Sequence, residues 1–257
     1  MAGADSPGEP KPRVRSAARA IALLQAIAAH GGGGIGATEL ARDLGLSRQV
    51  VYHLLHTLSA LQMVRKTNGN RYLLGLGVAT LAQGFNRQFQ APDFLLPYAR
   101  EAAEATGETA YAVGWVEGEI VVLASARGGL PVQAAEIPRG FAGDAHARAS
   151  GKLLLAMSPE DQVDAYLQRH PRTRRTAHTV ASRSGLKAQF AEIREQGFGM
   201  DREEFAEGLS CLAVPIGRMP AAFALGISAP TDRLTERQAA YLHSLRGVVA
   251  AHEGTSE

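Results

Sequence analysis

The sequence predicts an α+β protein with an N-terminal winged helix-turn-helix domain and a C-terminal domain built on an antiparallel sheet, joined by a linker helix. Three observations predict this class. Residues 38–74 follow the order helix, tight turn, helix and hairpin. Beyond residue 92, helical stretches alternate with pairs of strands, which is the pattern of a sheet flanked by helices. The chain has 257 residues, 46% hydrophobic and 20% charged, so it can bury two cores.

The first segment, residues 1–15, is rich in proline, glycine and charged residues and has no apolar core. We expect a disordered arm here, neither a signal peptide nor a membrane anchor. Its cations Lys11, Arg13 and Arg15 can contact phosphates or the minor groove of DNA, although such tails more often stay solvated. The segments expected after it are a winged-helix domain over 16–74, a linker helix over 75–91 and a second domain over 92–257.

The first helix of the winged domain is predicted to begin at Ser16, which can cap it, and to end at the glycines of 31–34. Its buried stripe consists of Ala20, Leu23, Leu24 and Ile27. We interpret this segment as the helix that supports the helix-turn-helix.

The helix-turn-helix itself has a predicted cap at each start. Thr38 can cap its first helix, with Glu39 facing the positive end of the helix dipole. Gly45 ends that helix, because glycine adopts the left-handed conformation at low cost, and Ser47 caps the next. The apolar residues of the second helix repeat at helical spacing and so share one buried face: Val51, Leu54, Leu55 and Leu58.

The opposite face of this second helix carries Arg48, Gln49, Tyr52, His53 and His56. Arg48 and Gln49 lie in the first turn, where a recognition helix meets base edges in the major groove. Arginine pairs with guanine and glutamine with adenine through two hydrogen bonds, each pair contributing roughly 1–3 kcal/mol of discrimination. The pattern therefore predicts sequence-specific DNA recognition.

The hairpin after residue 61 is predicted from alternating residues on either side of Asn68 and Gly69, a strong turn signal. It carries Arg65, Lys66 and Arg71, which are either phosphate contacts or merely solvated charges. Residues 1–90 hold ten Lys or Arg against four Asp or Glu, whereas residues 91–257 hold 17 against 21. A basic N-terminal part favours the DNA-binding interpretation. The predicted DNA-binding residues are Ser47, Arg48, Gln49, Tyr52, His53, Arg65, Lys66 and Arg71.

The remaining elements are predicted from periodicity and turn residues. The linker helix carries more apolar residues than an isolated helix can expose, so we expect it to pack on the N-terminal domain or on a second subunit. Helices are expected at 94–106, 146–157, 159–168 and 184–196, the last closed by Gly197, and a terminal helix capped by Thr235. Strands are expected at 109–116, 120–126, 131–136, 209–216 and 222–228, with an irregular stretch at 171–179.

Three segments resemble the IclR-type bacterial transcriptional regulators: GNRYLLGLGVATLA in the hairpin and linker, HARASGKLLLA from His146, and GFGMDREEFAEGLSCLAVPI from Gly197. The third is the most specific. The resemblance covers nearly all of residues 16–250. It implies a GAF-like C-terminal domain that binds a small effector, often an organic acid or aromatic catabolite, and a homodimer or a dimer of dimers on double-stranded operator DNA.

The chain also departs from the family pattern. It has Val50, then Tyr52 and His53, where the family often has a Thr or Ser near the start of the recognition helix and a His-Arg pair after it. The operator sequence therefore cannot be transferred from another member. Arg148 replaces the usual Thr two residues after His146 and is expected to place a cation near the pocket rim, or to pair with a nearby acid.

The resemblance implies an effector pocket lined by Ala149, Ser150, Asp201, Leu209, Cys211, Gly226 and Ser228. If residues 149–151 begin a helix, their free N–H groups form an anion site suited to a carboxylate. Simpler interpretations stay open: Cys211 as a small buried hydrophobe, Ser150 and Gly151 as close-packing residues, and Asp201 as part of a solvated strand end.

Enzymatic and metal-binding interpretations are weak. Gly151-Lys152 does not match a phosphate-binding loop, and a Cys211–His146 pair lacks a third orienting group. His53 and His56 lack a third zinc ligand, so we expect neither a metal nor a cofactor. The single cysteine excludes an internal disulfide framework and suits the reducing cytoplasm. The alternatives are a C-terminal domain that hydrolyses or otherwise turns over a small molecule, and a DNA-binding dimer without an effector.

Overall fold

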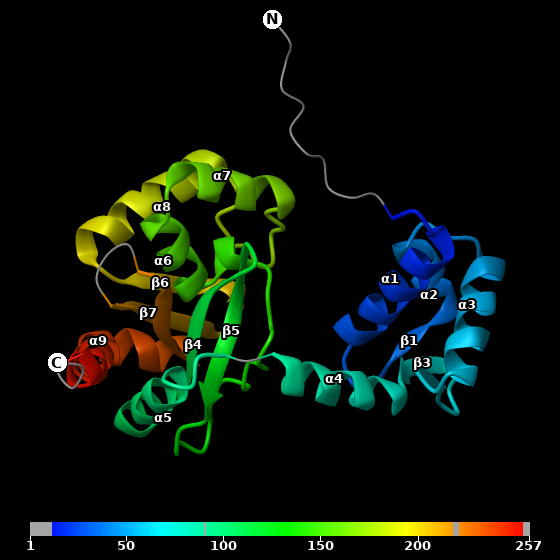
Figure 1. Ribbon diagram of the computed structural model, residues 1–257, viewed down its shortest axis with the longest axis horizontal. Coiled ribbons are helices and arrows are strands. Elements are labelled where there is room, and N and C mark those ends of the chain that lie inside the picture. The colour runs from blue at the N-terminus through cyan, green and yellow to red at the C-terminus, as the bar shows by residue number, and fades with distance from the viewer. Residues whose placement is uncertain (1–11, 90, 218–220, 254–257) are drawn as a thin grey trace, which may run out of the picture. The chain divides into compact units, whose positions relative to one another are not determined.

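The computed structural model in Figure 1 describes residues 12–89, 91–217 and 221–253. The chain divides into two compact units, Met1–Gln88 and Phe89–Glu257. Most of the predicted arm, including Lys11, lies outside the described residues, whereas Arg15 is already the first residue of a helix.

In its described residues, 12–88, the N-terminal unit combines four helices with a three-stranded antiparallel sheet of order β1-β3-β2 (Figure 1). The helices are α1 (Arg15–Ala29), α2 (Ala37–Asp43), α3 (Arg48–Ala60) and α4 (Gly77–Gln88). The strands are β1 (Ile35–Gly36), β2 (Val64–Lys66) and β3 (Arg71–Leu74). The predicted helices and the predicted hairpin are thus confirmed, and the short β1 is an addition.

The turn between α2 and α3 forms as predicted. Gly45 adopts the left-handed conformation, with φ of +61°. Ser47 caps α3, its Oγ accepting a hydrogen bond from the Val50 N–H at 3.3 Å. Val51 and Leu55 of α3 are fully buried in the core of the unit, together with residues of α1, α2 and the sheet. The burial of this stripe fixes which face of α3 remains exposed.

Two predicted caps are wrong. No side chain caps α1, which begins at Arg15, before Ser16. Helix α2 begins at Ala37, and the cap position is Gly36, whose N–H donates to the Glu39 carboxylate at 3.0 Å. The cap lies two residues before Thr38 because β1 leads directly into the helix and Glu39 satisfies the free N–H group of Gly36.

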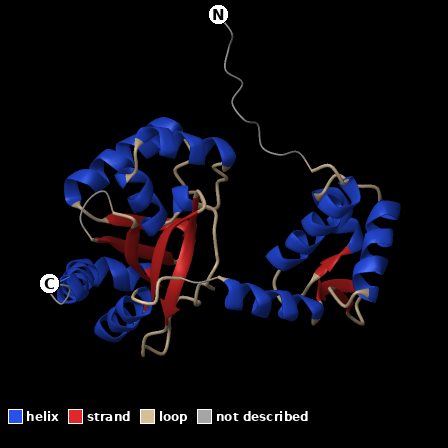
Figure 2. Ribbon diagram, viewed as in Figure 1, coloured by secondary structure: helices blue, strands red, loops and turns tan. Residues whose placement is uncertain are grey.

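The C-terminal unit is a five-stranded antiparallel sheet covered by helices on both faces (Figure 2). The strand order is β5-β4-β8-β7-β6. The strands are β4 (Thr109–Val116), β5 (Glu119–Ala126), β6 (Gly199–Ala206), β7 (Leu209–Ile216) and β8 (Phe223–Pro230). The helices are α5 (Leu95–Thr106), a 3-10 turn η1 (Ala145–Ala147), α6 (Ala149–Met157), α7 (Glu160–Arg169), α8 (Arg183–Gln196) and α9 (Thr231–Glu253).

Strand alternation divides the C-terminal core into two layers. On β7, Leu212 and Val214 pack with α5 and α9, whereas Cys211 and Ala213 pack with α6 and α8. Successive side chains of a strand point to opposite faces of the sheet. Because helices cover both faces here, most positions of β7 are apolar. The predicted sheet flanked by helices is confirmed, and the face under α6 becomes the one of functional interest.

Three expectations for the C-terminal unit are wrong. Residues 131–136 form no strand: separate side-chain contacts hold them, such as Thr109 Oγ1 donating to the Ala134 carbonyl at 2.7 Å. Strand β6 was not predicted, because it is rich in charge and carries a bulge where Glu203 has φ of +58°. Helix α9 begins at Thr231, directly after β8, and Thr235 bonds back to the Thr231 carbonyl inside it.

No helix in the described ranges combines the length and the apolar character needed to cross a lipid bilayer.

Candidate nucleic-acid interface and buried polar cluster

The outer face of α3 presents a continuous row of polar side chains. Arg48, Gln49, Tyr52 and His53 are all exposed, Tyr52 to 53%. The buried stripe behind them holds the helix in place, so the prediction that this row projects outward is confirmed. An exposed helix face of this kind matches what the major groove of DNA accepts.

The wing formed by β2 and β3 meets α3 at a hollow. Side chains from α2, α3 and the wing line this hollow of 380 Å³, including Tyr52, Lys66 and Asn70. Lys66 lies opposite Tyr72 in the sheet register, and Arg65 lies opposite Leu73 and so on the other face. The two cations are therefore both exposed, but only Lys66 lines the surface shared with the recognition helix.

Arg71, which we predicted as a third wing cation for DNA, is engaged within the unit. Its guanidinium donates to the carbonyls of Gly33 and Gly34, at 2.9 Å and 2.8 Å, and pairs with Glu39 at 3.3 Å. The hydrogen bond from Gly36, and then the charge of Arg71, lower the pKa of Glu39. Arg71 thus braces the wing against the start of α2.

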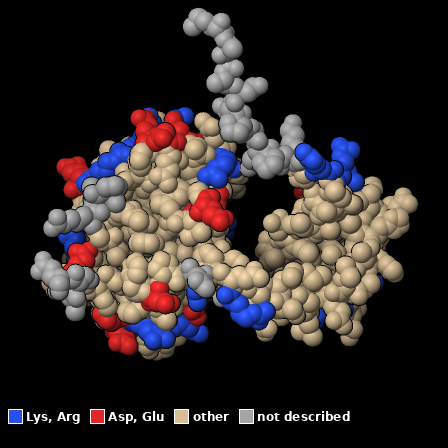
Figure 3. Space-filling model, in the orientation of Figure 1, with Lys and Arg blue, Asp and Glu red and all other residues tan. Residues whose placement is uncertain are grey.

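Charge differs between the two units. The ten basic residues of positions 1–90 face only four acidic ones, whereas acidic residues are in excess in 91–257. On the face drawn in Figure 3, the acidic side chains lie almost entirely over the C-terminal unit. The N-terminal unit therefore has the charge expected of a polyanion-binding surface.

The residues predicted for the effector pocket meet on the sheet face below α6. Asp201, Cys211 and Ser228 are direct neighbours across β6, β7 and β8. Cys211 Sγ lies 3.1 Å from Ser228 Oγ, which donates to the Tyr111 hydroxyl at 3.3 Å. Gly226 lies under the Tyr111 ring, since a Cβ there would be 2.8 Å from it. Tyr111 was not predicted, because nothing in its strand pattern distinguishes it.

The first turn of α6 contributes the other predicted residues. Ala149 and Ser150 are fully buried, and the Ser150 hydroxyl has no hydrogen-bond partner in the described ranges. Gly151 packs so closely on Ala145 that a side chain there would clash, which supports its close-packing interpretation. Leu209 is only partly buried, at the start of β7. Asp201, Cys211, Gly226 and Ser228 thus lie side by side on the sheet, and α6, which begins with Ala149 and Ser150, packs over the same face.

Asp201 is not a solvated strand end, since it is fully buried. Its Oδ1 accepts the N–H groups of Glu204 at 2.6 Å and Phe205 at 3.3 Å, which holds the bulge of β6. Burial raises the pKa of Asp201 to about 7, against the lowering effect of those hydrogen bonds and of Lys152. The carboxyl is therefore close to half-protonated at neutral pH.

A buried ion pair of Lys152 and Glu204 lies beside Asp201. Lys152 is 1% exposed, and Gln189 also donates to the Glu204 carboxylate at 3.2 Å. We did not predict this pair. The available signal was a lysine inside the apolar run GKLLLA, because such a lysine needs a buried partner.

Cys211 and His146 contact other groups: Cys211 Sγ lies 3.1 Å from Ser228 Oγ. His146 bonds the Thr173 carbonyl at 3.0 Å, and burial lowers its pKa. Burial also raises the pKa of the Cys211 thiol far above its usual range, so the thiol is a poor nucleophile. Within the residues that the structure describes, no three His, Cys, Asp or Glu side chains are grouped to hold a metal ion.

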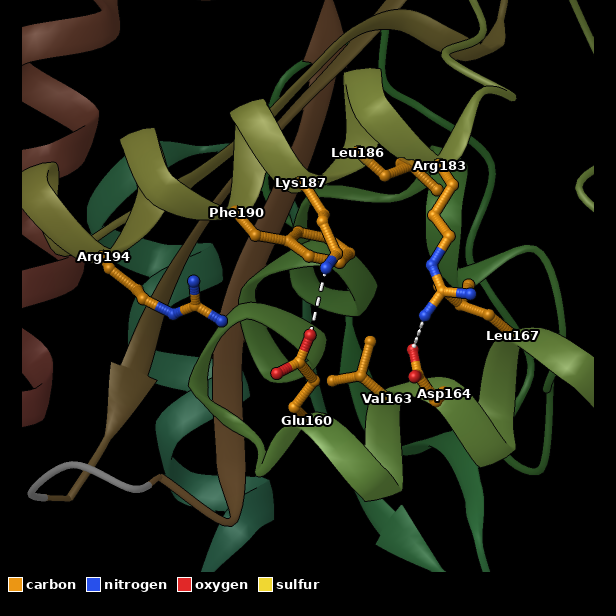
Figure 4. A pocket seen from close by; sticks show the side chains of 9 residues that line it. All are labelled: Glu160, Val163, Asp164, Leu167, Arg183, Leu186, Lys187, Phe190 and Arg194. Atoms are coloured by element: carbon orange, nitrogen blue, oxygen red, sulfur yellow. Dashed lines mark hydrogen bonds and ion pairs between the residues drawn. The ribbon is translucent and has the colours of Figure 1, made fainter.

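Between α7 and α8 a separate cavity of 270 Å³ opens over an apolar floor that includes Val163 and Phe190 (Figure 4). Its charged residues are paired: Lys187 with Glu160 at 3.0 Å, Arg183 with Asp164 at 2.5 Å, and Arg194 with the Ala156 carbonyl at 2.6 Å. The charged side chains of this cavity thus already have partners within the chain.

An exposed polar row on a capped helix, with a wing beside it, is typical of a winged-helix DNA-binding regulator. The second unit of this chain holds a buried polar cluster. Residues 16–68 match the IclR helix-turn-helix domain, and residues 94–251 match the domain described as bacterial transcriptional regulator IclR C-terminal. The protein belongs to the IclR family of transcriptional regulators.

Relatives support the same assignment over the whole chain. The HTH-type transcriptional regulator KdgR of Escherichia coli K12 is 31% identical, with 99% of this chain and 98% of KdgR covered. The transcriptional repressor IclR of the same strain is 29% identical, with 94% and 91% covered. The crystal structure of Thermotoga maritima IclR superposes with a TM-score of 0.60 over 91% of this chain and 96% of that one, at 24% identity, and so shows the same fold.

Proposed function

We propose that this regulator reads an operator sequence through α3 as a homodimer or dimer of dimers, and that a small organic acid bound in the C-terminal unit controls it. The observation that carries the proposal is the exposed row of Arg48, Gln49, Tyr52 and His53, anchored from behind by buried leucines. Its place of action in this proposal is the cytoplasm.

In this proposal the N-terminal unit divides its contacts by type. Arg48 and Gln49 pair with base edges, Ser47 at the helix start contacts the backbone, and Tyr52 and His53 extend the same face. Lys66 and Arg65 bind phosphates, which fixes register but not sequence. Arg71 holds the wing in place for those contacts.

The oligomer in this proposal is supported by α4 and the residues leading into it. Leu76 is 83% exposed and Leu81 is 62% exposed in the single chain. Regulators of this family act as oligomers, and a second copy would cover such apolar side chains. A two-fold dimer then presents two copies of α3 to half-sites about one helical turn apart.

The acid effector is supported by the first turn of α6, where a helix N-terminus and the unpartnered hydroxyl group of Ser150 lie. The acid acts by binding one oligomer geometry better than another. Reversing a 1:99 equilibrium requires about 5.5 kcal/mol of differential affinity, summed over the sites. A thermal-shift screen of aliphatic and aromatic carboxylates tests this part, and no shift with any acid would contradict it.

The DNA-binding part is tested by Arg48→Ala on an operator selected from random DNA. Loss of a bidentate base contact should weaken binding by about 1–3 kcal/mol and relax the preference at one base position. Arg202→Ala is the matched control, because it removes an exposed arginine from β6. Equal losses on all DNA sequences would show that Arg48 contacts only phosphate.

A further inference from the structure

Among the residues that the structure describes, one arginine of the C-terminal unit is buried without an ion-pair partner. Arg148 directly precedes α6 and is 4% exposed. Its Nη2 donates to the Ile120 carbonyl at 3.2 Å, and its guanidinium carbon lies 5.2 Å from the centre of the Phe141 ring. Its Nε and Nη1 are buried and have no hydrogen-bond partner in the described part of the chain. The residue expected at the pocket rim is therefore inside the unit.

Asp144 is the acid that interacts electrostatically with Arg148, and it already has a partner, as has Glu204 of the neighbouring cluster. Asp144 forms an ion pair with Arg175 at 2.9 Å, and Glu204 pairs with Lys152. Burial lowers the pKa of Arg148, but a guanidinium keeps its proton at neutral pH. A buried cation without a partner is unfavourable, and arginine cannot relieve this by becoming neutral.

The other groups near this guanidinium are uncharged. Tyr166, Tyr111 and Cys211 interact electrostatically with it, and burial raises the pKa of Tyr166 to about 12 and those of the other two as well. All three stay protonated. Ser150, two residues along, adds a buried hydroxyl without a partner and a free N–H group of the first turn of α6. The surroundings thus offer donors and positive charge.

We propose that Arg148, together with Ser150 and the first turn of α6, binds the carboxylate of the effector and selects acids over their uncharged analogues. This inference rests on the proposed function, because it places the acid group of that effector. Apolar side chains that include Ile137 and Phe141 pack against this layer of the core. They favour an organic carboxylate over inorganic phosphate, which needs donors on every side.

The proposal has an energetic consequence that a purely structural arginine would not have. If Arg148 has a counter-charge only when an anion is bound, its buried charge destabilises the ligand-free protein. Its replacement by an uncharged residue should then leave the melting temperature equal or higher. The same removal should weaken carboxylate binding by roughly 30-fold or more, as expected for loss of a buried charge-assisted contact. Stability and binding should therefore change in opposite directions.

The experiment compares wild type, Arg148→Met and Arg148→Gln by thermal shift and calorimetry. The probes are a panel of aliphatic and aromatic carboxylates that includes succinate and benzoate, the matching amides, and inorganic phosphate. Arg202→Met, which alters an exposed arginine of β6, is the matched control. We expect a carboxylate, but not its amide, to raise the Tm of wild type and of the control, and to have little effect on either Arg148 variant.

The outcomes separate the inference from the proposed function. An acid that binds wild type and both Arg148 variants equally would overturn the role of Arg148 and leave the acid effector in place. No response of wild type to any acid would overturn both. A response to phosphate alone would overturn the carboxylate class. A large fall in the Tm of the ligand-free variants would show a structural arginine and also overturn the inference.

Discussion

The outer face of α3 and the cluster below α6 both collect polar side chains, but under opposite conditions. On α3, water satisfies Arg48 and Gln49 in the free protein, so their presence is nearly neutral for folding. Below α6, every polar group has been removed from water and needs a partner inside the protein. An unpartnered group there, such as Arg148, therefore indicates a missing binding partner, whereas an exposed arginine without a partner is simply hydrated.

The difference teaches how to separate function from stability in this molecule. Substitutions on α3 should change DNA binding without unfolding the protein. Substitutions in the buried cluster should change stability, ligand response or both, depending on whether the group already has a partner. Lys152 and Arg148 are two buried cations that illustrate both cases, since Lys152 is paired with Glu204 and Arg148 is not.

The largest expected effect on stability comes from breaking the buried ion pair of Lys152 and Glu204. Lys152→Met leaves Glu204 buried without its partner and should lower the free energy of unfolding by about 3–5 kcal/mol. Urea unfolding monitored by circular dichroism measures it. The double variant Lys152→Met with Glu204→Leu is the control and should recover most of the loss. A single variant as stable as wild type would mean that the pair is not needed to keep the cluster folded.

Per pH unit, a smaller effect is expected from the protonation of Asp201. Its pKa is about 7 in the folded protein and ordinarily 3.8, so between these values the folded state holds a proton that the unfolded state has lost. Stability should fall by about 1.4 kcal/mol per pH unit as the pH rises through this window, and level off above it. Unfolding measured from pH 4 to 8 in wild type and Asp201→Asn checks this. If both proteins show the same pH slope, Asp201 does not titrate in this way.

The smallest effect is expected from replacing the wing cation Lys66, which should change DNA binding but hardly change stability. Lys66→Ala should weaken binding to all DNA sequences alike and reduce the salt slope of log K by about 0.9, as for one lost phosphate contact. Its unfolding free energy should stay within about 0.5 kcal/mol of wild type. Arg71→Ala is the informative comparison, because it also removes hydrogen bonds to Gly33 and Gly34 and should lower stability. An unchanged salt slope would remove Lys66 from the interface.

Much of the N-terminal unit could be predicted because its signals are local. Ser47 caps α3 within three residues, and Gly45 ends α2 by its own conformation. The hairpin turns at residues 68–70, where Asn70 and not Gly69 takes the positive φ, +57°. The caps at Ser16 and Thr38 were wrong because β1 and the Gly36–Glu39 hydrogen bond fix the helix starts from outside the cap residue. Local preferences describe an element, but neighbours decide where it begins.

The buried cluster was less accessible to sequence reasoning. Family resemblance suggested Asp201, Cys211 and Ser228, and the strand register places them side by side. Tyr111 comes from β4 and Lys152 from α6, and no spacing along the chain relates them to these positions. Strand β6 itself escaped prediction because its bulge breaks the alternation that marks a strand.

The sequence by itself determined the two units, the outward row on α3 and the basic character of the N-terminal part, because helical periodicity, turn residues and net charge act locally or by summation. The tertiary structure alone decided which polar groups are paired. Within the described residues, Arg71 pairs with Glu39 and Lys152 pairs with Glu204, whereas two nitrogens of Arg148 have no partner. Pairing depends on distances between segments far apart in the chain, and the free energy of a buried charge is set by those distances.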